Sequence, residues 1–289
     1  MRATRVSDIF ASREQPLSFE IFPPKGDLSV DQARKVIAGL APLRPDFVSV
    51  TCSAGGSGNG SGTSAVAAMV QDEFGIPAVA HLTCRDLTRD ALARRMKELK
   101  EAGIVNVLAL RGDPAPGKPD ASTGAYPHAV DVIPELTEAG FCVGAAAYPE
   151  GHIACTGLAD DVRHLRGKQD AGASFFVAQL CFDDEAIFRF LEKCRRAGIT
   201  VPITCGIMPF MSKAQLSRMV FMCAASLPSP VIRLLARHED DPEALRAAGV
   251  DYAVEQLLDL SRYGVSGLHL YTMNKPAVAR SCATGLHRR

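Results

Sequence analysis

AVAHLTCRDLTRDALARRMKELKEAGIVNVLALRG, residues 78–112, contains two apolar runs that a polar segment joins. The runs are nearly continuous, which is typical of strands covered on both faces of a parallel sheet. Between them, Leu92, Met96 and Leu99 recur at helical spacing, with charged residues on the other face. Gly103 suits the turn that ends such a helix. The stretch therefore predicts one strand–helix–strand unit.

The same pattern repeats along the chain. Eight apolar runs are predicted strands: residues 17–22, 47–52, 78–84, 105–112, 142–149, 174–182, 201–208 and 265–272. Ala-Gly recurs as a predicted helix C-cap at 102–103, 139–140, 171–172, 197–198 and 248–249.

Eight units of about 36 residues fit a single α/β domain, residues 1–289, folded as a (β/α)8 TIM-type barrel. A segment around 227–249, between the seventh and eighth strands, is interpreted as an insertion. A doubly wound open sheet is the alternative, because alternation of strands and helices alone does not separate the two folds.

Composition limits the partners of the protein. The chain is 47% hydrophobic and 22% charged, with 32 basic and 32 acidic side chains. Zero formal charge argues against nucleic acid or an anionic membrane as a partner. No apolar run approaches the roughly 18–20 residues that cross a bilayer, and the first residues lack the apolar segment of a secretory signal. We expect a cytoplasmic protein with no membrane partner.

Cysteine usage favours a reduced protein without a disulfide framework. The nine cysteines are an odd number and include no Cys-x-x-Cys pair. His81 and Cys84, and His152 and Cys155, have spacings that a metal ion could use. Each is only a pair, so we predict no metal site.

Polar side chains gather near the C-terminal ends of seven of the eight predicted strands. They are Glu20, Thr51, His81, Thr83, Arg111, Asp113, Tyr148, Gln179 and Tyr271. Barrel enzymes carry their chemistry at this end. The sequence therefore predicts one site at the barrel mouth.

Glu20 is the candidate acid of that site. Its neighbours Phe19 and Ile21 are apolar, and a carboxyl that loses solvation favours its protonated form. Such a group can act as a general acid near neutral pH. Pairing with an arginine inside the barrel is the alternative.

Two loops are candidates for ligand contact. Arg111-Gly112-Asp113 places a cation, a flexible glycine and an anion together, which suits either a ligand or a local ion pair. The glycine-rich residues 55–62 match a dinucleotide fingerprint only formally. We interpret them as a mobile substrate loop.

The chain resembles the 5,10-methylenetetrahydrofolate reductase family. The motifs that carry the resemblance are SFEIFPPK, FVSVTCSAGG, AHLTC, VLALRGDPAPG, AAYPEGH, KQDAGA, VAQLCFD, GIMPF and HLYTMN. They occur in this order and together span nearly the whole chain. The resemblance is to members of bacterial length that consist of the catalytic barrel.

The resemblance implies a barrel that binds FAD non-covalently, oxidises NADH or NADPH and reduces methylenetetrahydrofolate to methyltetrahydrofolate. The two substrates would take turns at one flavin face, in a ping-pong reaction. Glu20 matches the acid that protonates folate N10, and Asp113 a carboxylate near flavin and pterin. Residues matched to the folate or nicotinamide substrates are Thr51, Asp113, Gln179, Gln215 and Lys275. Residues matched to FAD are Thr51, Ala54, His81, Arg111, Gly112, Asp113, Tyr126, Tyr148, His152, Asp161, His164 and Lys168.

Some positions depart from the family pattern. Cys52 and Met219 stand where aromatic residues are usual, and Gly167 where an arginine that contacts phosphate is common. These departures leave a non-catalytic folate-binding barrel open as an alternative, and the nine cysteines together with the folate-like features leave open a zinc- or cobalamin-linked one-carbon methyltransferase barrel. The sequence leaves the choice between NADH and NADPH open, and we expect a homodimer or homotetramer.

Overall fold

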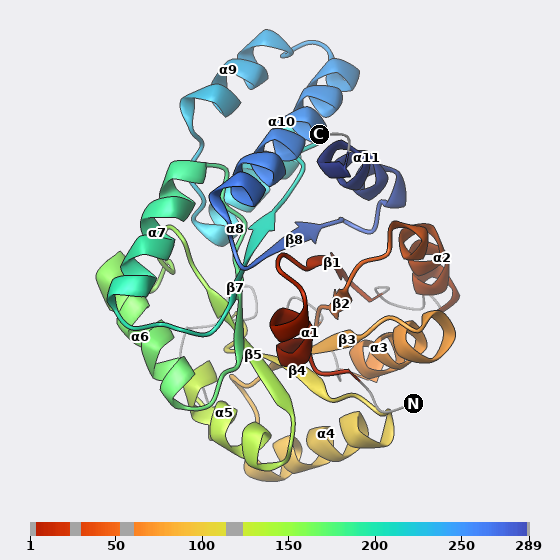
Figure 1. Cartoon of the computed structure of the whole chain (residues 1–289), viewed down its shortest axis with the longest axis vertical. Coiled ribbons are helices and arrows are strands. Elements are labelled where there is room, and N and C mark those ends of the chain that lie inside the picture. The colour runs from red at the N-terminus through yellow and green to blue at the C-terminus, as the bar shows by residue number, and fades with distance from the viewer. Residues whose placement is uncertain (1–3, 24–29, 53–60, 114–123, 288–289) are drawn as a thin grey trace.

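Eight parallel strands form a closed barrel in the computed structural model, which describes residues 4–23, 30–52, 61–113 and 124–287. Each strand pairs with the next in sequence, and the last pairs with the first (Figure 1). The strands are β1 (Leu17–Ile21), β2 (Phe47–Val50), β3 (Ala78–Thr83), β4 (Asn106–Leu110), β5 (Cys142–Ala147), β6 (Phe175–Ala178), β7 (Ile203–Ile207) and β8 (Gly267–Tyr271). All eight predicted strands and the (β/α)8 barrel are confirmed, and the open sheet is excluded.

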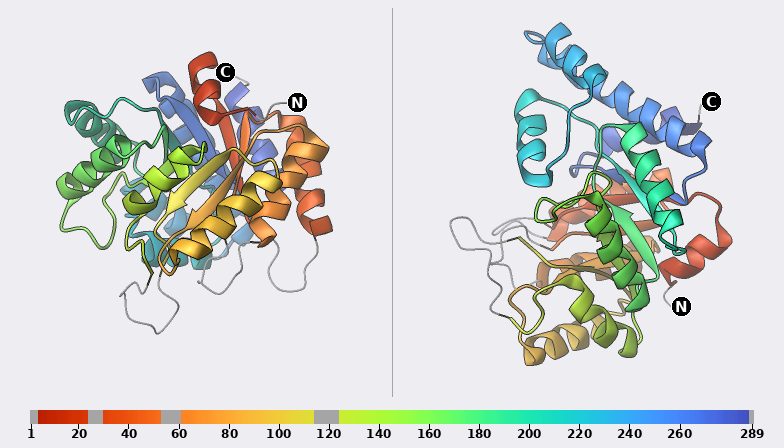
Figure 2. Two further views of the ribbon diagram at one scale, coloured as in Figure 1. Left: turned by 90° about the horizontal axis from the view of Figure 1, so that it is seen from below. Right: turned by 90° about the vertical axis from the view of Figure 1, so that its left-hand side faces the viewer.

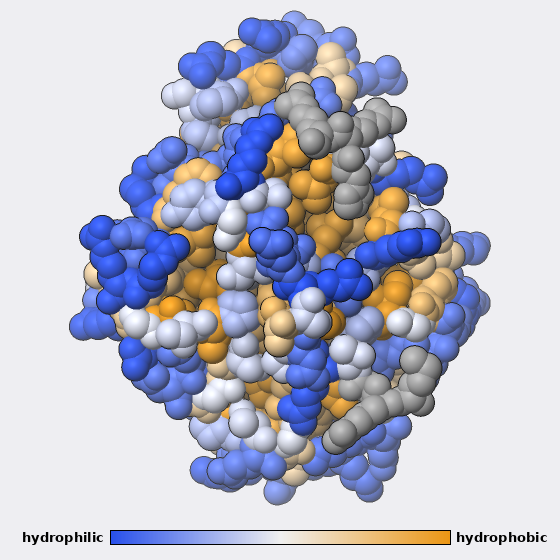
Figure 3. Space-filling model, in the orientation of Figure 1, coloured by the Kyte–Doolittle hydropathy of each residue, from blue (hydrophilic) through white to orange (hydrophobic). Residues whose placement is uncertain are grey.

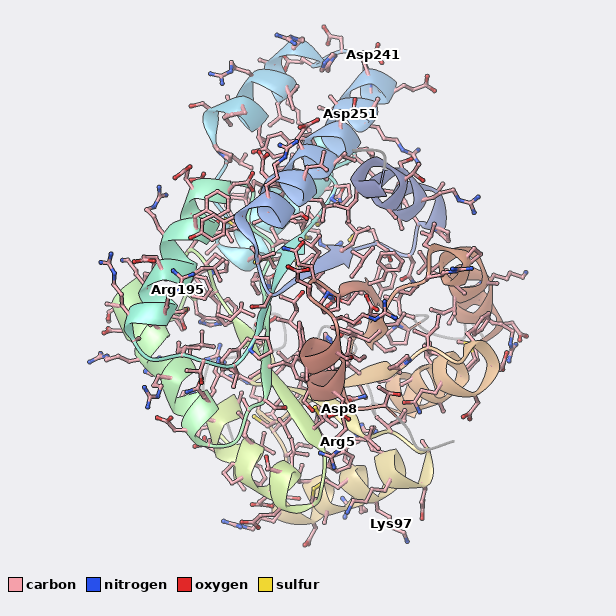
Figure 4. All side chains as sticks on the ribbon, in the orientation of Figure 1. Arg5, Asp8, Lys97, Arg195, Asp241 and Asp251 are labelled. Atoms are coloured by element: carbon pink, nitrogen blue, oxygen red, sulfur yellow. The ribbon has the colours of Figure 1, made fainter. Side chains whose placement is uncertain are left out.

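Helices surround the barrel (Figure 1). They are α1 (Val6–Ser12), α2 (Val30–Leu40), α3 (Ser61–Phe74), α4 (Arg89–Glu101), α5 (Ala129–Glu138), α6 (Leu158–Asp170), α7 (Asp184–Arg196), α8 (Lys213–Cys223), α9 (Ser229–Arg237), α10 (Pro242–Tyr263) and α11 (Pro276–His287), with a 3-10 turn, η1 (Ala41–Leu43). In Figure 4 the labelled Lys97, Arg195 and Asp241 lie on the helical periphery. None of the helices in these ranges is long and apolar enough to cross a membrane.

Helix α4 shows how local sequence determines where a helix begins and ends. The Thr88 hydroxyl accepts a hydrogen bond from the Ala91 N–H at 3.2 Å, which caps the helix. Gly103 follows the helix with φ +67°, a left-handed conformation that glycine adopts without strain. Leu92 and Leu99 are buried against the barrel.

Four of the five Ala-Gly pairs end helices as predicted, and their glycines have positive φ: Gly103, Gly140, Gly172 and Gly198. The prediction is wrong for Gly249, which lies inside α10. A Cβ at Gly249 would lie 1.9 Å from the carbonyl oxygen of Phe210. Glycine is present there because the helix packs directly on the backbone after β7.

The segment interpreted as an insertion contains α9 and the beginning of α10. Both project from the barrel in Figures 1 and 2, and α10 then continues back along it. The residues after β7 therefore include three helices, α8 to α10, before β8 begins.

Helix α1 closes the N-terminal end of the barrel. Phe10 packs against Phe47 and Phe175, the first residues of β2 and β6, with ring centroids 6.2 Å apart in each pair. The Val6 N–H donates to Oδ1 of Asn106, the first residue of β4, at 2.9 Å. Figure 2 shows α1 at one end of the barrel, and Figure 3 shows hydrophilic and hydrophobic residues mixed over that face. The opposite end is left for a site.

Candidate active site

Glu20 lies between two histidines at the C-terminal half of β1. Its Oε2 is 3.7 Å from Nε2 of His81 on β3 and 3.6 Å from Nε2 of His269 on β8. The Glu20 side chain is 18% exposed, whereas His269 is fully buried. Both distances are slightly longer than a hydrogen bond. Among the described residues, histidines rather than an arginine are the ion-pair partners of Glu20.

Two serine hydroxyls hold the imidazoles. Ser18 Oγ is 2.7 Å from Nδ1 of His269, and Ser49 Oγ is 2.6 Å from Nε2 of His81. His269 therefore presents one ring nitrogen to Ser18 and the other to Glu20. His81 presents the same nitrogen, Nε2, to both Ser49 and Glu20. Only His269 can pass a proton between a hydroxyl and the carboxylate through its two ring nitrogens.

The pKa of His81 is lowered to about 4, chiefly by burial; the Glu20 charge opposes this shift and the His269 charge adds to it. His81 is therefore neutral near pH 7. Nε2 of His269 is buried and has no hydrogen-bond partner within the described part of the chain. An uncompensated buried nitrogen that faces a carboxylate is where a hydrogen bond forms when either group gains a proton.

Tyr271 covers one side of this group. Its hydroxyl donates to the carbonyl of Ala178 at 3.0 Å, and its ring meets the His269 ring edge-on, with centroids 5.2 Å apart. Burial raises the pKa of Tyr271 well above its usual value, and the Glu20 charge adds to the shift. The phenol therefore stays neutral.

Asp113, which follows β4, faces the same end of the barrel as Glu20. The pKa of Cys223, at the end of α8, is raised to about 11, mainly by burial and in addition by the charges of Asp113 and Glu20. Both carboxylates thus act on one thiol. That Asp113 and Glu20 belong to one site stays a prediction.

Cationic and aromatic groups lie beside β5. Lys168 Nζ donates to the carbonyl of Ala146 at 2.8 Å and lies 5.7 Å from the centre of the Tyr148 ring. The Tyr148 ring meets the His152 ring edge-on at 4.7 Å. Burial lowers the pKa of Lys168 and of His152, and the Arg111 charge also lowers that of His152.

These groups fit a flavin dinucleotide. Arg111 and Lys168 are cations suited to a diphosphate, and the lowered pKa of Lys168 shows an ammonium that an anion would stabilise. Gly112, between Arg111 and Asp113, has φ +87°. A Cβ at Gly112 would lie 3.1 Å from Cβ of Thr83, so glycine keeps this turn close to β3.

Three residues matched to the substrates make local hydrogen bonds. Gln179 Oε1 accepts from the N–H of Leu180 at 2.9 Å. Gln215 Oε1 accepts from the N–H of Met211 at 2.8 Å. The Thr51 carbonyl accepts from Oγ1 of Thr63 at 2.9 Å. Each glutamine oxygen thus accepts from a backbone N–H, and an amide side chain has further hydrogen-bonding capacity for a ligand.

The remaining matched residues have different surroundings. Tyr126 is 2% exposed and donates to Glu135 of α5 at 2.8 Å, so it is not brought to the Glu20 group. Lys275 follows β8, and its N–H donates to the Thr272 carbonyl at 2.9 Å. Asp161 and His164 lie on α6, beside His152 and Cys155. Ala54 and most of the glycine-rich loop lie outside the described residues.

Ser18, Ser49 and His269 are not among the residues predicted from the sequence. A signal for them was present, because side chains two residues apart on a strand share a face. Ser18 precedes Glu20 by two residues, Ser49 precedes Thr51 by two, and His269 precedes Tyr271 by two. The alternation along each strand therefore assigns them to the same inward face.

The methylenetetrahydrofolate reductase family model matches residues 5–285. The chain is 35% identical over 262 residues to 5,10-methylenetetrahydrofolate reductase of Escherichia coli, which covers 90% of this chain and 86% of that protein. It is 32% identical over 284 residues to methylenetetrahydrofolate reductase (NADH) 1 of Arabidopsis thaliana, covering 93% of this chain. The chain spans about half of that plant protein, 48% of its length.

Solved structures share the fold at low identity. One is an uncharacterized protein from Clostridium thermocellum that binds two copies of 5-methyl-5,6,7,8-tetrahydrofolic acid, with TM-score 0.65, 16% identity and 97% of each chain covered. Oxaloacetate acetylhydrolase is more distant, with TM-score 0.57 and 10% identity over 96% of this chain and 82% of that one. At such identities the similarity concerns the barrel alone.

Proposed function

This chain belongs to the methylenetetrahydrofolate reductase family, and from that premise we propose that it reduces 5,10-methylenetetrahydrofolate to 5-methyltetrahydrofolate with bound FAD and NADH or NADPH. The observation that carries the proposal is the Glu20 carboxyl at the barrel mouth, held between His81 and His269. Family membership favours this reaction over the methyltransferase that the sequence left open.

FAD, when bound, would supply the hydride chemistry that nicotinamide oxidation and folate reduction share. Arg111 and Lys168 are the residues that would hold its diphosphate, because a fixed cation is the natural partner of that group. Tyr148 and His152 would contact it from the loop that follows β5. Both cations are half-buried, so salt would screen their attraction to a diphosphate only in part.

Glu20 would supply the proton that folate reduction needs. As the bond between the bridging carbon and N10 breaks, N10 takes the proton of the Glu20 carboxyl. The substrate is left as an iminium cation, which is ready to accept hydride. A carboxyl that is 18% exposed can hold this proton away from bulk water.

His269 would reload Glu20. Its Nδ1 lies 2.7 Å from Ser18 Oγ, and its Nε2 faces the carboxylate. A proton that enters at Nδ1 leaves from Nε2, so the imidazole can return the carboxylate to its acid form. Neutral His81, which uses one nitrogen for both neighbours, would orient Glu20 instead.

Asp113 would stabilise the iminium cation. A carboxylate and a cation about 4 Å apart attract by about 1 kcal/mol in water, but by about 4 kcal/mol at an effective dielectric constant near 20. The assistance is therefore useful only when bound ligands exclude water from the mouth.

An anaerobic titration tests the proposal. Purified protein should show flavin absorbance that NADH or NADPH bleaches and that methylenetetrahydrofolate restores, with methyltetrahydrofolate as product. Comparison of the two nicotinamide cofactors gives the preference directly. Protein that binds folate tightly but contains no reducible flavin would overturn the proposal in favour of a non-catalytic barrel.

A further inference from the structure

Glu150 connects the loop after β5 to the segment between α8 and α9. Both of its carboxylate oxygens accept from the N–H of Ser226, at 3.2 Å each, and Oε1 also accepts from the Ser226 hydroxyl. The two residues are 76 positions apart in sequence. Hydrogen bonds to an ionised acceptor are the stronger kind, so one carboxylate holds this segment by its backbone and by a side chain.

The same carboxylate acts on the loop after β6. Cys181 is buried there, two residues after Gln179. Burial raises the pKa of the Cys181 thiol, and the charge of Glu150 and a hydrogen bond to Glu150 raise that pKa as well. Glu150 therefore joins three segments, which follow β5, β6 and α8.

Helix α8 does not take the usual course of a barrel helix. A helix that links two parallel strands returns along the outside of the barrel, so its last residues lie at the N-terminal end of the strands. The last residue of α8, Cys223, instead lies near enough to Asp113 and Glu20 for their charges to raise its pKa. Ser226, three residues later, reaches the loop after β5. Helix α8 therefore stays at the mouth end of the barrel.

Apolar packing alone holds α8 weakly. Leu216 is the only buried residue of this helix, all of which the structure describes. At the N-terminal end, the Ser212 hydroxyl caps the helix by accepting from the N–H of Gln215 at 3.1 Å. At the C-terminal end, Ala224 turns the chain with φ +53°, and Ser226 follows. The contact with Glu150 thus gives the C-terminal end of α8 its polar anchor.

We propose that Glu150 is a positioning residue, which holds α8 over the barrel mouth and thereby raises the affinity of the site for folate. The inference rests on the proposed function, because α8 carries Gln215, which is matched to the substrates. Without this anchor the ligand itself would have to order the C-terminal end of α8, and that cost lowers its affinity. The proton transfer from Glu20 would not change, so the effect falls on binding rather than on the limiting rate.

Three variants of the whole protein, with any flavin that it holds, test the anchor: Glu150→Ala, Glu150→Gln and Ser226→Ala. Titration calorimetry with 5-methyltetrahydrofolate measures the affinity, and hydrogen exchange measures the opening of residues 213–223. We expect Glu150→Ala to bind about tenfold more weakly and to exchange faster in α8. Glu150→Gln keeps one acceptor oxygen and should recover part of both. Ser226→Ala keeps its N–H and should lose less affinity than Glu150→Ala.

Glu192→Ala is the matched control, because it removes another glutamate that accepts from two partners, Arg195 and Arg196 of α7. It should change neither the folate affinity nor the exchange of α8. Circular dichroism shows which variants are folded. Ser226 is exposed, so Ser226→Ala keeps the test decisive should Glu150→Ala fail to fold.

The folate half-reaction separates positioning from a general loss of structure. Glu150→Ala should need about tenfold more methylenetetrahydrofolate to reach half of its limiting rate of flavin reoxidation, and that limiting rate should stay within about twofold of the wild type. Unchanged affinity and unchanged α8 exchange in folded Glu150→Ala, or a lower limiting rate at unchanged affinity, would overturn the positioning role.

The flavin titration decides the reductase proposal separately. A protein that reduces folate equally well with and without the Glu150 carboxylate refutes only the anchor. A protein that holds no reducible flavin, but whose folate affinity still falls about tenfold in Glu150→Ala, refutes only the reductase. A wild type that binds no folate refutes both.

Discussion

Glu20 and His269 connect the first and last strands of the barrel, with 3.6 Å between the carboxylate Oε2 and the imidazole Nε2. The strands β1 and β8 also pair directly, with Glu20 opposite Tyr271. The Glu20–His269 pair therefore forms only when β1 and β8 close the barrel. Residues about 250 positions apart in sequence form it, as the Ser18–His269 contact shows.

The two serines offer a matched test of the proton path. Ser18→Ala removes the hydroxyl at Nδ1 of His269, whereas Ser49→Ala removes the hydroxyl at Nε2 of His81. We expect Ser18→Ala to lower folate reduction by about tenfold to a hundredfold, within the range of general acid–base effects, and to shift its pH profile. Ser49→Ala should change the rate far less. Rapid-mixing measurement of flavin reoxidation by methylenetetrahydrofolate gives both rates, and equal losses would refute the distinction between the histidines.

The His81 pKa predicts how stability depends on pH. The pKa is lowered from 6.5 to about 4 in the folded protein, so the unfolded chain binds more protons between these values. The stabilisation is complete above about pH 6.5 and is lost as the pH falls toward 4. At about 1.4 kcal/mol per pKa unit the loss is at most roughly 3 to 4 kcal/mol.

Urea unfolding at pH 7, 5.5 and 4.5 measures this dependence. His81→Gln should unfold with a shallower pH dependence than the wild type. His238→Gln, at the C-terminal end of α9 and distant in sequence from the barrel mouth, should retain the wild-type slope. An identical slope in the wild type and His81→Gln would contradict the assignment of the proton uptake to His81.

We expect alanine to change the stability in opposite directions at two helical glycines. Gly249→Ala places a methyl group 1.9 Å from the Phe210 carbonyl oxygen, so α10 must shift, and we expect destabilisation by about 1 to 3 kcal/mol. Gly167→Ala, inside α6, meets nothing within 4 Å. It should stabilise the protein by about 0.5 to 1 kcal/mol, because alanine favours the helix. Thermal unfolding of both variants decides, and the same sign of change in both would refute this account.

The barrel could be predicted because its signals are local. Each strand has its own apolar run, and the positive-φ glycines after α4 and α7 mark helix ends within a few residues. Gly249 was misinterpreted because its reason is a contact with Phe210, which no local pattern reveals. Close packing between distant segments is not visible in a single sequence.

The candidate site could be predicted in part. Glu20 stood out because a carboxyl in an apolar run is unusual, and Tyr271 because it ends a strand. Ser18 and His269 were missed, since their significance depends on the β1–β8 pairing that closes the barrel. The match of Tyr126 to FAD stays a prediction, and in the structure its hydroxyl donates to Glu135.

Replacement of Glu20 by glutamine tests the central claim most directly, because glutamine keeps the size of the side chain and removes its acidic proton. Flavin reduction by the nicotinamide cofactor and flavin reoxidation by methylenetetrahydrofolate are measured separately by rapid mixing. The account predicts that Glu20→Gln loses folate reduction by at least about a hundredfold, within the range of general acid catalysis, while nicotinamide oxidation stays close to the wild-type rate. Equal losses in the two half-reactions, or folate reduction that persists, would contradict it.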